Sequence, residues 1–252
     1  MPQNVYTRNF LEEVVFQVRY SPILELITTE KGVASKFQKI VSKEFPDVKC
    51  THNKKVNFKI NAITGESVGG KFNEDFLIWE FSNNYKKVKL SGDELILSYS
   101  KGNYSSFDEL CHDVELILTA LKEYMEPKIN SIGLRYINRI NCIDTDDELK
   151  EYINPKLVVN EIFNNDILQS LCRLEFKIDK YFLAFQYGQF NPEYPNINGK
   201  KEFILDYDCI LRSVKIDDIL SNLESMNNII VNKFEDCIQD KLRNYMGVNN
   251  AN

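Results

Sequence analysis

The sequence predicts an α+β protein: a curved antiparallel sheet with helices packed on one of its faces. Three observations predict this class. Short runs alternate apolar and polar residues, amphipathic segments with helical spacing lie between them, and the same order of elements occurs in both halves of the chain. With 252 residues and 43% hydrophobic content, the chain can bury an ordinary core. We therefore expect two pseudo-equivalent halves, residues 1–127 and 128–252, that share one continuous sheet.

The first half begins with a strand and a helix. Residues 11–20, LEEVVFQVRY, place Val14 and Phe16 on one side of the chain, with the two-residue period of a half-buried strand. Residues 31–45 carry apolar residues at the spacing of a helix. Four β-rich runs follow, at residues 56–62, 76–81, 86–90 and 94–99. Serine and then acidic residues predict the start of a helix that covers residues 105–125.

The second half repeats this order. A strand at residues 131–141 precedes a helix that is signalled by the capping box Thr145–Glu148. Strands follow at residues 171–178, 181–190 and 202–211. One apolar stripe predicts a single long helix over residues 215–246. The expected unit is β-α-β-β-β-(β)-α, used twice.

Two short matches support an internal duplication. Gln17-Val-Arg-Tyr20 matches Gly133-Leu-Arg-Tyr136, and the segment LKEYM at residues 121–125 matches LRNYM at residues 242–246. Because the matched segments hold the same places in the two halves, duplication is the better interpretation. The segments expected to be equivalent are the first strands, 11–20 and 131–140, and the last helices, 106–125 and 226–246.

The alternation along the strands assigns arginines to the face of the sheet that the helices leave open. In residues 131–140, SIGLRYINRI, Leu134 and Tyr136 share the apolar side, so Arg135 and Arg139 point the other way. The same reasoning in the other strands predicts a cation-rich open face. Its candidate binding residues are Arg19, Lys59, Arg135, Arg139, Arg173 and Lys177.

The same alternation predicts which side chains are buried. The residues expected beneath the helices are Leu134, Tyr136, Leu174, Phe176, Phe203 and Leu205, whereas Arg173 and Lys177 are expected to be exposed. A few acids, Glu175, Asp206 and Asp208, fall among the basic positions of the open face.

Two interpretations of the charged face compete. In the first, its residues form cross-strand ion pairs on a solvated surface, each contributing about 0.2–1 kcal/mol. In the second, the face docks a partner through planar guanidinium groups. The second interpretation predicts a non-enzymatic binding or regulatory accessory protein without a cofactor. Its predicted partner is a protein, with nucleic acid as the alternative.

One pair of acids allows an enzymatic alternative. Asp206 and Asp208 are two residues apart in a predicted strand, so their side chains leave the same face about 7 Å apart and could share a divalent cation. No histidine base or third ligand accompanies them, and pairing with neighbouring basic residues is the simpler interpretation. A divalent-cation-dependent enzyme around these two residues stays the weaker hypothesis.

Charge and cysteine content limit the remaining classes. The net charge of −6 argues against nonspecific coating of nucleic acid or anionic membranes. Six widely spaced cysteines and two histidines show no zinc-binding spacing. No secretory signal pattern and no long apolar run occurs in the sequence, so we expect a cytoplasmic protein without a membrane contact.

The motifs VVFQVR and GLRYIN, together with a final helix that ends in a methionine-glycine pair, carry a resemblance over nearly the whole chain. The chain resembles a sporadically distributed family of uncharacterised bacterial proteins of about this length. The resemblance implies no established activity. Such patchy occurrence implies carriage on mobile or phage-defence-associated loci, with a partner encoded by a neighbouring gene. The doubled order of elements is, separately, similar to that of the saddle-shaped TATA-box-binding proteins, and a similarity of fold does not establish function.

Overall fold

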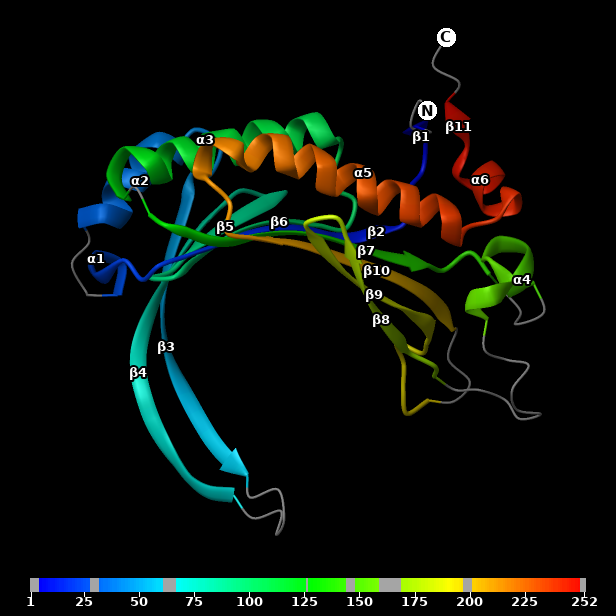
Figure 1. Ribbon diagram of the computed structural model, residues 1–252, viewed down its shortest axis with the longest axis horizontal. Coiled ribbons are helices and arrows are strands. Elements are labelled where there is room, and N and C mark those ends of the chain that lie inside the picture. The colour runs from blue at the N-terminus through cyan, green and yellow to red at the C-terminus, as the bar shows by residue number, and fades with distance from the viewer. Residues whose placement is uncertain are drawn as a thin grey trace.

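A computed structural model of the protein describes residues 5–27, 32–60, 67–125, 127–143, 148–158, 169–196 and 201–249 (Figure 1). For residues 5, 53–60, 67–76, 124, 125, 248 and 249 it describes the backbone alone. Most of the predicted capping box at residues 145–148 lies outside the described residues.

Nine strands form one antiparallel sheet in the order β3-β4-β5-β6-β2-β7-β10-β9-β8. The strands are β2 (Leu11–Tyr20), β3 (Asp47–Ile60), β4 (Ser67–Ser82), β5 (Lys86–Leu90), β6 (Glu94–Ser100), β7 (Ile129–Ile140), β8 (Cys172–Ile178), β9 (Tyr181–Phe190) and β10 (Glu202–Arg212). The predicted α+β class with an antiparallel sheet is confirmed.

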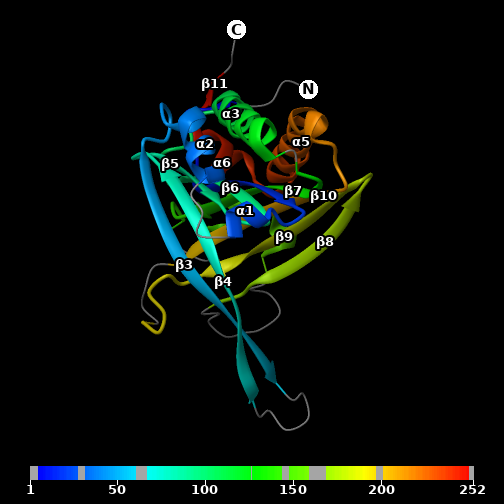
Figure 2. The same ribbon diagram turned by 90° about the vertical axis from the view of Figure 1, so that its left-hand side faces the viewer.

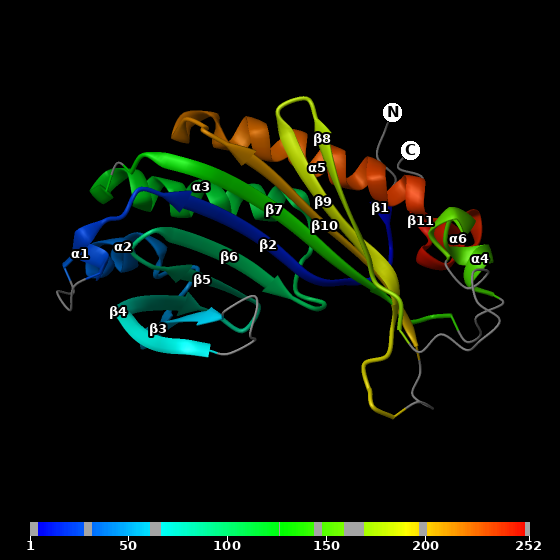
Figure 3. The same ribbon diagram turned by 60° about the horizontal axis from the view of Figure 1, so that its bottom comes forward.

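The helices gather on one side of this sheet. Figure 1 shows α2, α3 and α5 above the curved sheet, whose opposite, concave side is open. Figure 3 shows the open side, with β2, β7 and β10 running next to one another. The helices are α1 (Leu24–Ile27), α2 (Gly32–Val41), α3 (Phe107–Met125), α4 (Leu149–Tyr152), α5 (Ile219–Cys237) and α6 (Asp240–Met246).

The core lies between the helices and the sheet. In β2, Val14 and Phe16 are fully buried, while Gln17 and Arg19 on the other parity are not. In α3, Leu110, Val114, Ile117 and Leu121 share one face at helical spacing and are fully buried. Burial of apolar surface, about 25 cal/mol per Å², therefore holds the helices to one face and leaves the other to polar chemistry.

β2 and β7 form the central pair of the sheet, and their register places Gln17 directly opposite Gly133. Outward from β2 follow β6, β5, β4 and β3, and outward from β7 follow β10, β9 and β8. β6, which pairs with β2, and β10, which pairs with β7, are therefore the last strands that the two halves contribute to this sheet.

The β3–β4 hairpin projects away from the rest of the molecule, as Figures 1 and 2 show. β3 begins earlier than the predicted run at residues 56–62, of which residues 61 and 62 lie outside the described part of the chain. β4 begins earlier and ends later than the predicted run at residues 76–81. The polar segment Lys49–Asn53 joins β3 because β4 pairs with it over its whole length, so tertiary pairing outweighs the weak local β propensity.

The prediction of one helix over residues 215–246 is wrong. The helix breaks after Cys237, and α6 begins at Asp240. Between them, Ile238 bridges Ile153, and the N–H of Gln239 donates to the carbonyl of Tyr152. The segment LRNYM therefore forms the separate α6 and not the end of a helix that matches α3. An apolar stripe continues through such a break because both helices bury a face against the same core.

Burial agrees with prediction except at the sheet edge. Leu134, Tyr136 and Leu205 are buried, as is Phe203, whereas Leu174 and Phe176 are 39% and 42% exposed. The expected burial of these two residues is wrong because β8 is an edge strand and α5 packs on β7 and β10. No helix in the described part of the chain is long and apolar enough to cross a membrane.

Candidate functional site

The candidate site is the open face, the side of the sheet opposite α3 and α5. Strand alternation places Arg19 of β2 and Arg135 and Arg139 of β7 on this face, next to Asp206 and Asp208 of β10. The register sets Val15 opposite Arg135 and Arg19 opposite Ser131. The sequence-predicted residues of the three central strands therefore do come together.

Arg135 and Asp206 form the tightest contact of this face. Nε of Arg135 donates to Oδ1 of Asp206 at 2.8 Å, and a terminal guanidinium nitrogen donates to Oδ2 at 2.7 Å. The guanidinium is half-exposed, whereas the carboxylate is only 10% exposed. This hydrogen bonding raises the pKa of Arg135 above its ordinary value. A planar fork that is already occupied by a carboxylate makes a poor free docking group.

Asp208 faces Arg135 in the register but makes no such paired bond. Burial raises the pKa of Asp208, and the guanidinium of Arg135 opposes that shift. Because Asp206 is engaged by Arg135, the two acids are not a free pair of ligands. Among the described residues, no group of three or more His, Cys, Asp or Glu side chains could hold a metal ion.

Arg139 is held by two acids from neighbouring strands. Its Nε donates to Glu202 at 2.7 Å, and a terminal nitrogen reaches Glu12 at 3.3 Å. Its guanidinium also lies over the ring of Phe190, 5.7 Å from the centroid. Three contacts from β2, β9 and β10 thus fix this side chain at one end of the central strands.

Arg19 is the least constrained of the central arginines. Its side chain is 61% exposed and lies 3.9 Å from Glu94 of β6. The same carboxylate accepts a shorter hydrogen bond, 2.8 Å, from the side-chain amide of Gln17. Of the three arginines predicted at the centre of the face, Arg19 is the one most available to a partner.

The other three candidates lie on outer strands of the sheet. Arg173 and Lys177 are exposed on the edge strand β8, and Arg173 pairs with Glu175 of the same strand at 3.2 Å. Lys59 lies in the β3–β4 hairpin, where its backbone pairs with Val68, and its side chain is outside the described set. Arg173 is close enough to the centre to act on Asp208, where it opposes the burial-raised pKa together with Arg135 and Arg19, whereas Lys59 and Lys177 are not brought together with the central arginines.

Acids are more numerous on the open face than the sequence analysis expected. They alternate with the cations, so the central face carries mixed charge and is not a basic field. The acids on this parity are Glu13, Glu80, Glu94, Glu175, Glu202, Asp206 and Asp208.

Apolar side chains separate these charges. Ile137 of β7 lies between Arg135 and Arg139, and Phe182 of β9 is 44% exposed beneath Arg212, whose guanidinium is 5.5 Å from the ring centroid. The apolar residues on this parity of the described strands are Val15, Ile78, Ile96, Ile137, Phe182, Ala184, Phe190, Ile204 and Ile210. Charged and apolar side chains are therefore interspersed on the open face.

A hollow of about 270 Å³ lies at one end of this face. It is lined by side chains of β2, β4, β5 and β6 and by the turn that joins β4 to β5. Lys87 contributes a cation to it, Glu13 and Glu80 contribute carboxylates, and Ser98 and Ser100 contribute hydroxyls. The hollow exists because the side chains of Ser98 and Ser100 on β6 are too small to fill it.

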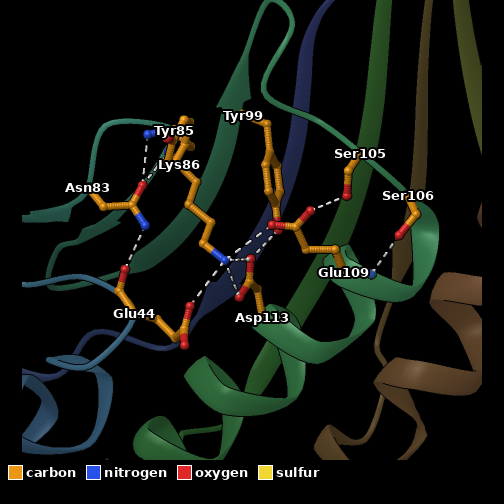
Figure 4. Close-up of polar contacts among 9 residues, drawn as sticks. All are labelled: Glu44, Asn83, Tyr85, Lys86, Tyr99, Ser105, Ser106, Glu109 and Asp113. Carbon is orange, nitrogen blue, oxygen red and sulfur yellow. Dashed lines mark hydrogen bonds and ion pairs between the residues drawn. The ribbon is translucent and has the colours of Figure 1, made fainter.

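A second polar cluster is buried on the helix side, and the sequence analysis missed it. Lys86 of β5 donates two hydrogen bonds to Asp113 of α3, at 2.8 and 2.7 Å (Figure 4). The hydroxyl of Tyr99 donates to the same carboxylate. Lys86 is 7% exposed and Asp113 fully buried, with Glu44 and Glu109 each 3.5 Å from the ammonium group. The contact to Asp113 raises the pKa of Lys86 against the effect of burial.

A signal for this cluster exists in the sequence. Lys86 has the same parity as the apolar Val88 and Leu90, and Asp113 falls in the apolar stripe of α3. A charged residue at a core position of an amphipathic element requires a buried partner. Because Lys86 and Asp113 have opposite charges, the sequence pattern predicts that they pair with each other.

No protein-family model matches the chain, and no curated protein matches it.

Proposed function

We propose that this protein is a non-enzymatic binding protein, an accessory or regulatory component whose open face engages a protein partner. The observation that carries the proposal is the mixture of paired charges and apolar side chains on a concave, helix-free sheet face. Protein interfaces combine apolar contact with polar groups whose hydrogen bonds are satisfied. Ile137, flanked by Arg135 and Arg139, has this character at the centre of the face.

Charge distribution favours a protein over nucleic acid. Phosphate binding needs cations that are free to replace counterions. Arg135 and Arg139 are already matched by Asp206 and Glu202, and the chain carries a net charge of −6. Nucleic acid stays the alternative partner, and a cation-dependent enzyme around Asp206 and Asp208 is the weakest of the three functions.

The duplicated architecture is part of the same proposal. The two halves, residues 1–127 and 128–252, would be copies of one β-α-β-β-β-(β)-α unit, in an order like that of TATA-box-binding proteins. In support, the matched positions Gln17 and Gly133 face each other in the central pair, and the matched Arg19 and Arg135 lie two residues beyond them. A pseudo-two-fold axis through the Gln17–Gly133 pair relates these positions. The matched arginines then flank the centre of the face symmetrically.

The proposed partner follows from the resemblance described above. We place the partner at a neighbouring gene of a mobile or phage-defence-associated locus. The cytoplasm is the proposed compartment, in keeping with six cysteines that form no disulfide with one another, of which Cys50 is exposed. Unpaired thiols persist in a reducing compartment.

The decisive experiment is a tagged pull-down from the native host, with mass spectrometry and nucleic-acid detection on the same eluate. The test variant is Val15→Lys, at the centre of the open face, and its matched control is Val48→Lys, an exposed valine on the other parity, in β3. We expect the wild type and Val48→Lys to capture the same protein at moderate salt, and Val15→Lys to lose it. Recovery of nucleic acid that falls steeply with salt favours the alternative. Equal capture by both variants contradicts a role for the open face.

A further inference from the structure

The outer edge of β8 ends the nine-stranded sheet, and no described strand pairs with it. An edge strand presents N–H and C=O groups that can pair with another strand. This edge also exposes apolar surface, since Leu174 and Phe176 are 39% and 42% exposed. Both lie on the helix side of the sheet, beyond the strands on which α5 packs. The edge of β8 is thus both unpaired within the described strands and apolar.

Charges alternate along the other side of β8. Arg173, Glu175 and Lys177 share the open face, and all three are exposed. Arg173 pairs with Glu175 at 3.2 Å, whereas Lys177 makes no ion pair with a described residue. A strand that fits this edge should therefore place a carboxylate opposite Lys177 and apolar side chains opposite Leu174 and Phe176.

The sequence of β8 itself meets both requirements. When two β8 strands lie antiparallel with Phe176 opposite Phe176, Glu175 of each copy faces Lys177 of the other, and Leu174 faces Ile178. A shift that places Glu175 opposite Glu175 also sets Arg173 opposite Lys177, so like charges meet at every charged position. The register centred on Leu174 leaves Lys177 without a carboxylate. Charge complementarity therefore selects a second copy of this chain, in one register.

We propose that β8 pairs antiparallel with β8 of a second copy, with Phe176 on the two-fold axis and Glu175 opposite Lys177. The interface is isologous, as in most symmetric dimers. It covers Leu174 and Phe176 in both copies and provides a partner for Lys177. Because the axis is perpendicular to the joined sheet, the two open faces lie on the same side of the dimer.

Charge exchange tests the dimer. We expect the wild type to show concentration-dependent dimerisation in sedimentation equilibrium. Glu175→Lys and Lys177→Glu each place like charges opposite each other twice, so each should weaken the dimer by about tenfold or more. The double variant Glu175→Lys/Lys177→Glu restores both attractions and should return the dissociation constant to within about threefold of the wild type. Lys87→Glu, the same change of charge at an exposed residue of β5, is the matched control.

Two results overturn the proposal. One is a wild type that stays monomeric up to millimolar concentration. The other is a double variant that dimerises no better than its two parents. Thermal melts of all variants should match the wild type at low concentration, because the exchanged residues are exposed.

Cross-linking tests the register. Directly opposed residues of an antiparallel pair have Cα atoms about 4.5–5.5 Å apart, within the range that a disulfide spans. Phe176→Cys should therefore form a covalent dimer under mild oxidation, whereas Leu174→Cys should not, because Leu174 faces Ile178. The wild type is oxidised in parallel to account for the exposed Cys50. A covalent dimer from Leu174→Cys with none from Phe176→Cys contradicts the proposed register.

Discussion

Arg135 and Asp206 form a two-pronged ion pair between β7 and β10, with the carboxylate almost buried and the guanidinium half-exposed. The two residues are not directly opposite each other, because the strand register sets Asp206 opposite Ile137 and Asp208 opposite Arg135. The arginine therefore reaches diagonally to the more buried acid. This choice makes Arg135 a structural tie as well as part of the open face.

The first prediction concerns this tie. Arg135→Ala should lower the free energy of unfolding by about 1–2 kcal/mol, because Asp206 stays buried without its cation. Solvent around the half-exposed guanidinium keeps the loss below that of a fully buried pair. Arg173→Ala, which removes an exposed pair, is the control and should change stability by less than about 0.5 kcal/mol. Urea denaturation measures both. Equal effects at the two positions would show that Arg135 is merely solvated.

A second prediction addresses the buried cluster around Lys86. Lys86→Met should cost about 3–5 kcal/mol of unfolding free energy, because it leaves the fully buried carboxylate of Asp113 without its cation. Adding Asp113→Leu should recover most of that loss, since an apolar pair can replace a buried ion pair. Lys87→Met, at the exposed neighbour, is the matched control and should be nearly neutral. A double variant as unstable as Lys86→Met would contradict this account and point instead to Tyr99 or Glu109.

How far the sequence predicts this molecule can be judged from particular elements. Alternation in β2, β7 and β10 correctly predicts which side chains of the centre are buried, because both neighbours of each strand lie in the same sheet. Alternation fails at Leu174 and Phe176, where period alone does not reveal that a strand lies at the edge. Alternation also assigns Arg135 to the open face, but it does not reveal the ion pair with Asp206. Whether Arg135 pairs with the directly opposite Asp208 or with the diagonal Asp206 depends on side-chain geometry.

The third prediction concerns alkaline pH. Burial raises the pKa values of Tyr20, Tyr99, Tyr136 and Tyr207 above the ordinary value of 10.0. A group whose folded pKa is raised keeps its proton in the folded state while the unfolded chain loses it, so stability falls as the pH rises above the unfolded value. The unfolding free energy should therefore be level between about pH 7 and 9 and decline above about pH 10. Urea titrations at several pH values measure this decline. The exposed tyrosines, such as Tyr85 and Tyr194, serve as the internal reference, since they ionise in the folded protein. Variants of the four buried positions to phenylalanine that lower the tyrosinate absorbance of the folded protein near pH 10 would contradict burial of these hydroxyls.

A fourth prediction concerns Asp208, whose pKa is raised in the same direction but takes effect at acidic pH. Its folded pKa is raised by burial, so the ionised carboxylate costs stability at neutral pH, and the cost disappears as the pH falls through the folded pKa. Asp208→Asn should raise the thermal midpoint at pH 7 by about 1–3 °C, and this gain should vanish near pH 4. Asp206→Asn is the control and should destabilise at pH 7, because it removes the carboxylate that Arg135 binds. A gain from Asp208→Asn that does not depend on pH would rule out desolvation of the carboxylate as its cause.

The last prediction compares two glycines in neighbouring parts of the sheet. At Gly188 of β9, φ is +145°, and a Cβ atom would lie 1.7 Å from the backbone carbonyl oxygen of Ser170. Ser170 is held in place because its N–H donates a hydrogen bond to the carbonyl of Gln189. The backbone cannot move out of the way as a flexible side chain could. Gly188→Ala should therefore destabilise the protein by several kcal/mol or prevent folding. A Cβ atom at Gly133 would meet its nearest neighbours at 3.9 Å or more, which is ordinary contact.

Gly133→Ala should therefore be tolerated, with a gain of about 0.5–1 kcal/mol from reduced freedom of the unfolded chain. Thermal and urea unfolding of the two alanine variants, side by side, measure the difference. Because Gly133 lies opposite Gln17 at the centre of the open face, the folded Gly133→Ala protein also reports on binding. If it keeps full stability but loses the captured partner, the partner contacts the centre of the sheet at this position. A Gly188→Ala protein as stable as Gly133→Ala would mean that the chain before β8 does not pack on β9 as described.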